Sequence, residues 1–215
     1  MKTLSLVVPS YNAQDYLLRC LKSLVPDGEA ADVEVIVIDD GSTDSTAAAA
    51  EQFAAHHPET VRVIRQANAG HGGAINTGVA HARGEYLKVV DSDDWLDRGA
   101  YAALLDELRA SIRQRREVDL FVTNYVYEKV GRKRRAAVRY GSVMPLGRDF
   151  GWEEVQRFRP WQYLLMHALT YRTEVLRRAG LTLPRHTFYV DNLFAFVPSR
   201  TCGACATSML TSTGT

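Results

Sequence analysis

The sequence has only three cysteines among its 215 residues, too few for the disulfide frameworks of small secreted proteins. Cys202 and Cys205 form one C-x-x-C without a second pair, a weak signal for zinc or redox chemistry. No apolar run approaches the roughly 18 residues that a transmembrane helix needs. The apolar core of residues 1–9 is also too short for a signal peptide, so we expect a cytoplasmic protein.

The sequence also lacks a large excess of positive or negative residues. The formal net charge is +1, which argues against a general nucleic-acid binder. Two common phosphate-binding motifs are absent as well. The glycine-rich stretch 70–73 is not followed by Gly-Lys-Ser/Thr, which excludes a Walker loop. The first expected strand-to-helix turn lacks G-x-G-x-x-G, which excludes a dinucleotide fingerprint.

What the sequence does have is an acidic stretch at the end of an apolar run. Tyr86–Val90 reads as a buried strand, and Asp91, Asp93 and Asp94 follow it directly. Unpaired carboxylates are costly to bury, so the strand should end in a cleft. Asp91 and Asp93 are two residues apart and point the same way in an extended chain. They could hold Mg²⁺ with a substrate diphosphate, whereas capping of the next helix suits Asp94 better.

The first half of the chain alternates between strand and helix patterns. The β-branched run at 33–38 is typical of a strand that is buried on both faces. Such alternation predicts an α/β fold with a parallel sheet and right-handed crossovers. Strands are expected at 4–8, 33–38, 61–64 and 86–90, and helices at 13–24, 44–56 and 74–83.

The second half has a weaker pattern. The sequence predicts an amphipathic helix at 101–115, a strand at 119–127 and a basic turn at 129–139. Residues 161–170 and 174–179 also look helical.

Polar groups follow each of the first four strands, and a parallel sheet brings those ends to one edge. We therefore expect a single cleft. Asp40 could accept a hydrogen bond from a pyrimidine N–H, and Pro9 and Tyr11 offer apolar or stacking surface to a base. Gly70 lets the backbone approach a ligand closely. The segments concerned are Ser10–Asn12, Asp39–Asp40, Asn68–His71 and Asp91–Asp93.

Four motifs, in order, resemble the signatures of family-2 glycosyltransferases. They are Pro9-Ser10-Tyr11-Asn12, Asp39-Asp40-Gly41-Ser42-Thr43-Asp44, Asn68-Ala69-Gly70-x-x-x-Ala74-x-Asn76-x-Gly78 and Asp91-Ser92-Asp93-Asp94. The resemblance covers about residues 1–100. It implies a GT-A fold with a mostly parallel central sheet, and inverting transfer from a nucleotide diphosphate sugar, usually a UDP-sugar, with Mg²⁺ or Mn²⁺.

The same resemblance assigns roles to residues. Asp91 and Asp93 match the D-x-D pair that holds ribose and the metal-bound diphosphate. The residues expected to bind the nucleotide sugar are Pro9, Tyr11, Asn12, Asp40, Asn68, Gly70, Asp91 and Ser92.

Inversion in one displacement needs a general base to deprotonate the acceptor hydroxyl. The segment 189–193 resembles the place where the family carries this base, which makes Asp191 the candidate. The alternative is that Asp191 is a cap or a surface acid. His71 and His167 could line the cleft, although a lone histidine is more often structural.

We expect three regions: a nucleotide-sugar half over 1–118, an acceptor half over 119–198, and an aberrant tail over 199–215. Residues 199–215 show no helical or strand period. If permitted codons are chosen for these residues and the gene is read in a shifted frame, the translated sequence resembles the usual continuation of the family. A frame shift or truncation predicts a poorly ordered tail.

The predicted activity is hexosyl transfer to a hydroxyl of a glycan or other acceptor, in polysaccharide or cell-envelope synthesis. We expect no nucleic-acid partner, and the protein could associate peripherally with the inner face of the membrane. Two alternatives stay open, a non-catalytic nucleotide-sugar-binding remnant and a nucleotidyltransferase. The latter would need a basic glycine-rich loop after the first strand, where residues 9–12 lack one. The sugar, the acceptor and the oligomeric state are not fixed by any motif.

Overall fold

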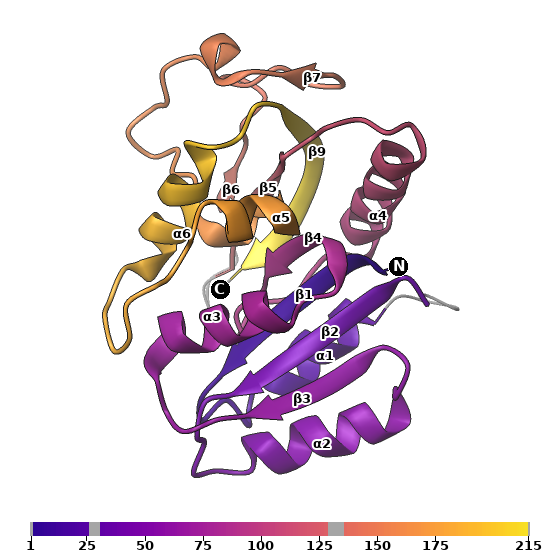
Figure 1. Cartoon of the computed structure of the whole chain (residues 1–215), viewed down its shortest axis with the longest axis vertical. Coiled ribbons are helices and arrows are strands. Elements are labelled where there is room, and N and C mark those ends of the chain that lie inside the picture. Colours follow the sequence, from indigo (N-terminus) through magenta and orange to yellow (C-terminus); the bar gives the residue numbers. More distant parts are fainter. Residues whose placement is uncertain (1, 26–30, 129–135, 215) are drawn as a thin grey trace.

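The computed structural model describes residues 2–25, 31–128 and 136–214. Within these ranges the molecule is built on one mixed sheet of nine strands in the order β3-β2-β1-β4-β8-β5-β9-β7, with β6 paired to β5 (Figure 1). The strands are β1 (Lys2–Ser10), β2 (Val33–Asp39), β3 (Val61–Arg65), β4 (Gly84–Val89), β5 (Leu120–Tyr127), β6 (Ala136–Val138), β7 (Asp149–Phe150), β8 (Leu169–Arg172) and β9 (Cys205–Gly214). The predicted α/β class is confirmed.

The first half of the chain forms the parallel part of the sheet. Strands β3, β2, β1 and β4 are all parallel neighbours, as the alternating pattern predicts. Every residue of β2 is buried, in agreement with its nearly continuous apolar run, and the buried residues include Glu34 and Asp39. The helices of the whole chain are α1 (Leu17–Leu24), α2 (Thr46–His56), α3 (Gly70–His81), α4 (Arg98–Arg113), α5 (Thr173–Arg178) and α6 (Val190–Ser199).

Two apolar clusters lie on opposite faces of this sheet. One face packs against α1, α2 and α4, through residues such as Leu21, Ala50 and Leu105. The other packs against α3, α5 and α6, through residues such as Ile75 and Phe194. Burial of both faces is what a largely parallel sheet requires.

The region 161–170 corrects the sequence analysis. It contains no α-helix but a short 3₁₀ turn at Met166–Ala168, followed by β8. Strand β8 pairs antiparallel with β4 on one side and with β5 on the other. Apolar residues at helical spacing therefore did not decide the structure here. The structure was decided instead by hydrogen bonding of this segment between β4 and β5. Such pairing depends on tertiary context and leaves no local sequence pattern.

Two helix starts also differ from expectation. Helix α1 begins at Leu17 rather than near residue 13, and the side chain of Asn12 does not cap it. Helix α4 begins at Arg98, and Asp97 caps it by accepting a hydrogen bond from the Ala100 N–H at 2.9 Å. Asp94 is instead buried, so its predicted capping role is wrong.

The tail is a further correction. Instead of being poorly ordered, Cys205–Gly214 form β9, which runs parallel to β5 and antiparallel to β7 (Figure 1). Asp119 fixes its start, because its Oδ2 accepts from the Gly203 N–H at 2.8 Å and its N–H donates to the Ala204 carbonyl at 2.9 Å. Backbone pairing beside β5 orders a segment whose side chains show no strand period. No helix among the described residues is long and apolar enough to cross a membrane.

Candidate functional site

A cleft of about 350 Å³ opens at the carboxyl ends of β1, β2 and β4 and at the start of α3. Asp40 shares it with Asp91 and Asp93, so the expected convergence of distant loops is what the structure shows. The residues that line the cleft are Pro9, Ser10, Tyr11, Asp40, Asn68, Gly70, His71, Ala74, Asp91, Ser92 and Asp93. They include seven of the eight residues predicted to bind the nucleotide sugar.

The exception is Asn12. Its Oδ1 accepts from the Thr43 N–H at 2.8 Å, and its own N–H donates to Ser42 Oγ at 3.1 Å. Asn12 adopts a positive φ of 48°, a conformation that Asn tolerates better than most residues. It joins the loop after β1 to the loop after β2 and does not line the cleft.

Asp40 is held firmly in the cleft wall. Its side chain is almost fully buried, and its Oδ1 accepts from Gln66 Nε2 at 2.6 Å and from the Ala69 N–H at 2.9 Å. Buried carboxylates need such partners. The two bonds fix the orientation of the carboxylate before any ligand arrives.

His71 joins two acids that come from different halves of the chain, Asp91 and Asp191. Its Nε2 lies 3.5 Å from Asp91 Oδ1 and 3.6 Å from Asp191 Oδ1. Burial alone would lower the pKa of His71, but Asp191, Asp91 and Asp93 together raise it above its ordinary value. The ion pair with His71 lowers the pKa of Asp191, which keeps that carboxylate ionised and able to accept a proton.

The carboxylate of Asp91 is not fully compensated by neighbouring positive charge. Its Oδ1 is buried and accepts no hydrogen bond within the described part of the chain. Burial and the charges of Asp191 and Asp93 raise the pKa of its carboxyl to about 6, against the opposing effect of His71. A divalent cation would supply the missing charge, so the donor set fits a metal ion.

Asp91 also belongs to a second possible ligand set. Ligand atoms of Asp91, Asp94 and His167 lie within 4.8 Å of one another. Burial and the charge of Lys88 lower the pKa of His167 to about 4, so its imidazole is neutral at physiological pH, as metal ligands require. Asp93 is exposed. The structure thus contains the predicted Asp91–Asp93 pair and a deeper set that shares Asp91.

The segment that carries Asp191 rests on helix α3. Asn76 Nδ2 donates to the Leu183 carbonyl, and Asn76 Oδ1 accepts from the Leu183 N–H, both at 2.9 Å. A Cβ on Gly72 would lie 2.6 Å from the carbonyl oxygen of Pro184. Asn76 of the third motif and Gly72 therefore dock the chain that leads to Asp191, and neither lines the cleft.

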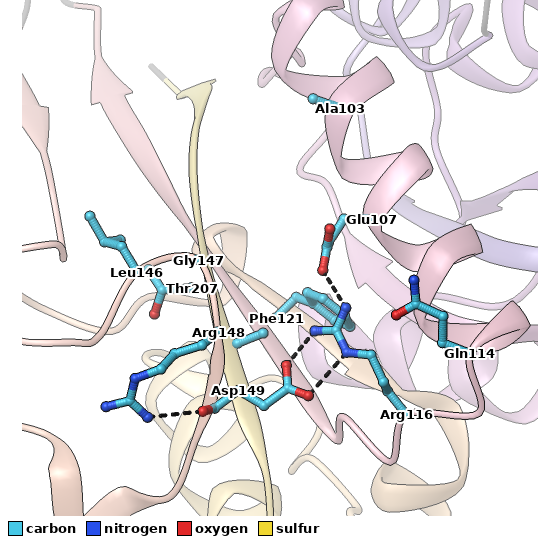
Figure 2. Close-up of a pocket in the computed structure, with 11 residues that line it drawn as sticks. Ala103, Glu107, Gln114, Arg116, Phe121, Leu146, Gly147, Arg148, Asp149 and Thr207 are labelled. Carbon is cyan, nitrogen blue, oxygen red and sulfur yellow. Dashed lines mark hydrogen bonds and ion pairs between the residues drawn. The ribbon is translucent and has the colours of Figure 1, made fainter.

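A larger cavity lies elsewhere, between α4 and the strands β5, β7 and β9 (Figure 2). Its volume is about 880 Å³. Arg116 points into it but is already paired with Asp149 and Glu107. The other arginine of this cavity, Arg148, is paired with Glu154. The cavity also lacks the cluster of three aspartates that lines the strand-end cleft.

A model of the family described as Glycosyl transferase family 2 matches residues 5–174. The chain belongs to glycosyl transferase family 2. The uncharacterized glycosyltransferase EpsJ of Bacillus subtilis is 27% identical over 203 residues, which cover 89% of this chain and 55% of that protein. Chondroitin synthase of Escherichia coli is 42% identical over 108 residues, half of this chain and 16% of that protein. The family-2 chain thus spans only part of these relatives.

Solved structures agree on the fold. Residues 1–349 of S. aureus TarS in complex with UDP-GlcNAc superpose with a TM-score of 0.77, at 23% identity, over all of this chain and 59% of that one. Mannosyltransferase PcManGT from Pyrobaculum calidifontis, in complex with GDP-Man and Mn²⁺, gives a TM-score of 0.67 at 20% identity, over 98% of this chain and 56% of that one. The predicted GT-A fold is therefore confirmed.

The structure gives His71 and Lys88 more prominent places than sequence does. From sequence, His71 could line the cleft but is more often structural, although its place directly after Gly70 in the third motif is a usable signal. Lys88 was missed inside the apolar run 86–90. It is 1% exposed, and its Nζ donates to the His167 carbonyl. A charged residue in the middle of a buried strand was the available signal.

Proposed function

We propose that this chain transfers a hexosyl group from a UDP-sugar to a hydroxyl of a glycan acceptor, with inversion at the anomeric carbon. The observation that carries the proposal is the meeting of the four strand-end segments in one cleft, with Asp191 joined to Asp91 through His71. The TarS complexes with UDP-GlcNAc and with UDP support a UDP-sugar as donor. The name of the chondroitin synthase relative supports a polysaccharide product.

The residues divide the work of one displacement. Pro9 and Tyr11 contact the base, and Asp40 accepts its ring N–H. Asp91 and Asp93 would hold Mg²⁺ or Mn²⁺, which would offset the charge that develops on the departing diphosphate. The acceptor oxygen bonds to the anomeric carbon as the bond from that carbon to the diphosphate oxygen breaks. The acceptor proton passes to the carboxylate of Asp191, which His71 keeps ionised and oriented.

Two variants separate binding from transfer. Asp93→Ala removes a metal ligand, so the rise in melting temperature on adding UDP should no longer depend on Mn²⁺. Asp191→Asn removes the base, so UDP binding should persist while UDP release from the donor falls by about 100-fold or more. A thermal-shift series and a UDP-release assay with UDP-glucose, UDP-GlcNAc and UDP-glucuronate measure both effects.

Equal affinity of the parent protein for UDP with and without Mn²⁺ would contradict the metal assignment. Metal-dependent UDP binding with no UDP release from any donor would favour the non-catalytic remnant. His167→Ala tests the deeper ligand set, because it should leave the Mn²⁺ dependence intact if Asp91 and Asp93 hold the ion.

A further inference from the structure

The connector between α5 and α6 exposes two aromatic rings beside the candidate base. Phe188 is 89% exposed and Tyr189 is 81% exposed, more than any other large apolar residue in the described ranges. Contiguous exposed apolar surface on a soluble domain usually marks a contact site. These rings immediately precede Val190 and Asp191 in the chain.

The connector is not loosely attached. Its start is fixed to α3 by the two hydrogen bonds between Asn76 and Leu183. Further along, the His186 N–H donates to the Ala69 carbonyl at 3.3 Å. Gly70 lies so close to this segment that a Cβ there would come within 2.6 Å of the His186 nitrogen. The rings are therefore held outward by a segment docked along α3.

The backbone around the rings is strained. His186 has a φ of 50° and Tyr189 a φ of 63°, values that bulky residues rarely adopt. Such conformations cost free energy, and they cluster at functional sites and ligand clamps. Here the two strained residues bracket Thr187 and Phe188, and the second lies two positions before Asp191.

We propose that Phe188 and Tyr189 form the acceptor subsite, where they stack against the apolar C–H face of a saccharide and present one of its hydroxyls to Asp191. This inference rests on the proposed function and extends it by naming the residues that bind the glycan acceptor. Aromatic rings offer a large, rigid surface at a low entropic cost. Pyranose rings have a flat C–H face that matches such a surface.

The surroundings favour a saccharide over a lipid surface. The side chain of Asp191 is 43% exposed, and the neighbouring Thr187 and Asn192 are exposed as well. A carboxylate beside inserted rings would oppose entry into a bilayer. The same polar groups can hydrogen-bond with sugar hydroxyls.

The test compares Phe188→Ala and Tyr189→Asn with Phe196→Ala. Asn tolerates the positive φ of residue 189. Phe196 is a matched control because it is 65% exposed and lies on α6, five residues after Asp191, outside the connector. UDP release is measured with the best of the three donors, first with water as acceptor and then with cellotetraose, chitotetraose or maltotetraose added. Saturation-transfer NMR records the binding of each tetraose directly.

In the parent protein we expect at least one tetraose to bind and to accelerate UDP release. Each ring variant should raise the KM for that tetraose by about tenfold, with the donor KM and the release into water unchanged within about twofold. Phe196→Ala should match the parent. The melting temperature should not fall in any variant, since the rings that are removed are exposed.

Three results would overturn the inference. One is UDP release that none of the three saccharides accelerates. Another is a saccharide KM that the ring variants leave unchanged. The third is binding to phosphatidylglycerol vesicles that both ring variants abolish, which would assign the rings to a membrane surface. Absence of UDP release in the parent protein, with water or with saccharide, is instead a failure of the proposed function.

Discussion

At the scale of single residues, Lys88 is the most unusual feature of the site. Burial lowers the pKa of its ammonium to about 7, and the charge of Asp94 opposes that shift only in part. Its Nζ donates to the carbonyl of His167, on the side of β4 that faces the buried acids. Lys88 thus lies beside Asp94 and His167, two members of the deeper ligand set.

The pH dependence of stability follows from that pKa. Between about pH 7 and the ordinary lysine value of 10.5, the unfolded chain binds a proton at this position that the folded chain does not bind. The contribution of Lys88 to stability therefore rises with pH across this range. Lys88→Met should be more stable than the parent by on the order of 2 kcal/mol at pH 6, and this advantage should shrink toward pH 10.

Urea unfolding at pH 6, 7, 8 and 9 measures this difference. Lys22→Met is the control, because Lys22 is exposed on α1 and its removal should leave the pH slope of the parent unchanged. Identical slopes for the parent and Lys88→Met would show that Lys88 does not titrate in this range.

At the scale of elements, the contact between α3 and the connector is specific enough to test with one glycine. Gly70 has a φ of +75°, and a Cβ there would meet the backbone of His186 at 2.6 Å. Gly147 has nearly the same φ, +72°, with nothing within 4 Å of a Cβ. Gly147→Ala therefore reports the cost of the positive φ alone, about 1–2 kcal/mol.

Gly70→Ala should cost about 1–3 kcal/mol more than that, because the clash adds overpacking. It should also move the connector and lower UDP release, whereas Gly147→Ala should retain full activity. Chemical denaturation and the UDP-release assay give the two readouts. Equal losses of stability in the two variants would mean that the connector can shift away from α3 without cost.

Some elements of the fold could be predicted from the sequence and others could not. Strands β1, β2 and β4 were predictable, because each is a largely apolar run that ends near Pro9, Asp39 or Asp91. Strand β3 was predictable from Val61, Val63 and Ile64 between two helical segments. Strand β8 was not, because Leu169–Arg172 is ordered by partners on both sides, and apolar residues from Trp161 onward repeat at helical spacing. The polar residues at the ends of the strands predict the cleft from sequence. The contacts of His71 with two aspartates and the docking of Leu183 on α3 depend on tertiary packing and could not be predicted.

At the scale of the whole molecule, the two halves of the chain differ in how far sequence describes them. The four linked motifs fix the fold and the cleft in the first hundred residues. The division near residue 118 stays a prediction, since β4, from the first half, pairs directly with β8, from the second. Pairing across that boundary makes one continuous sheet (Figure 1).

The place of β9 in this sheet leads to a measurable expectation. Its residues Cys205, Ala206 and Thr207 are buried, and the strand lies between β5 and β7. We expect the amides of these residues to exchange with deuterium as slowly as those of Phe121 and Val122 in β5, because all of them need a large opening of the sheet to exchange. Exchange within seconds at residues 205–207, with protection retained in β5, would restore the interpretation as a disordered tail.

The strand order also has a consequence for synthesis on the ribosome. Strands β1 to β4 pair only with one another apart from the contact with β8, so this part of the sheet can assemble once residue 89 has left the exit tunnel. Strand β5 has to wait for β8 on one side and for β9 on the other. At usual elongation rates that wait lasts on the order of ten seconds. Until then, among the described strands, β5 can pair only with β6, over residues 125–127, and both edges of residues 120–122 stay open. This makes β5 the expected contact for a chaperone that binds the growing chain.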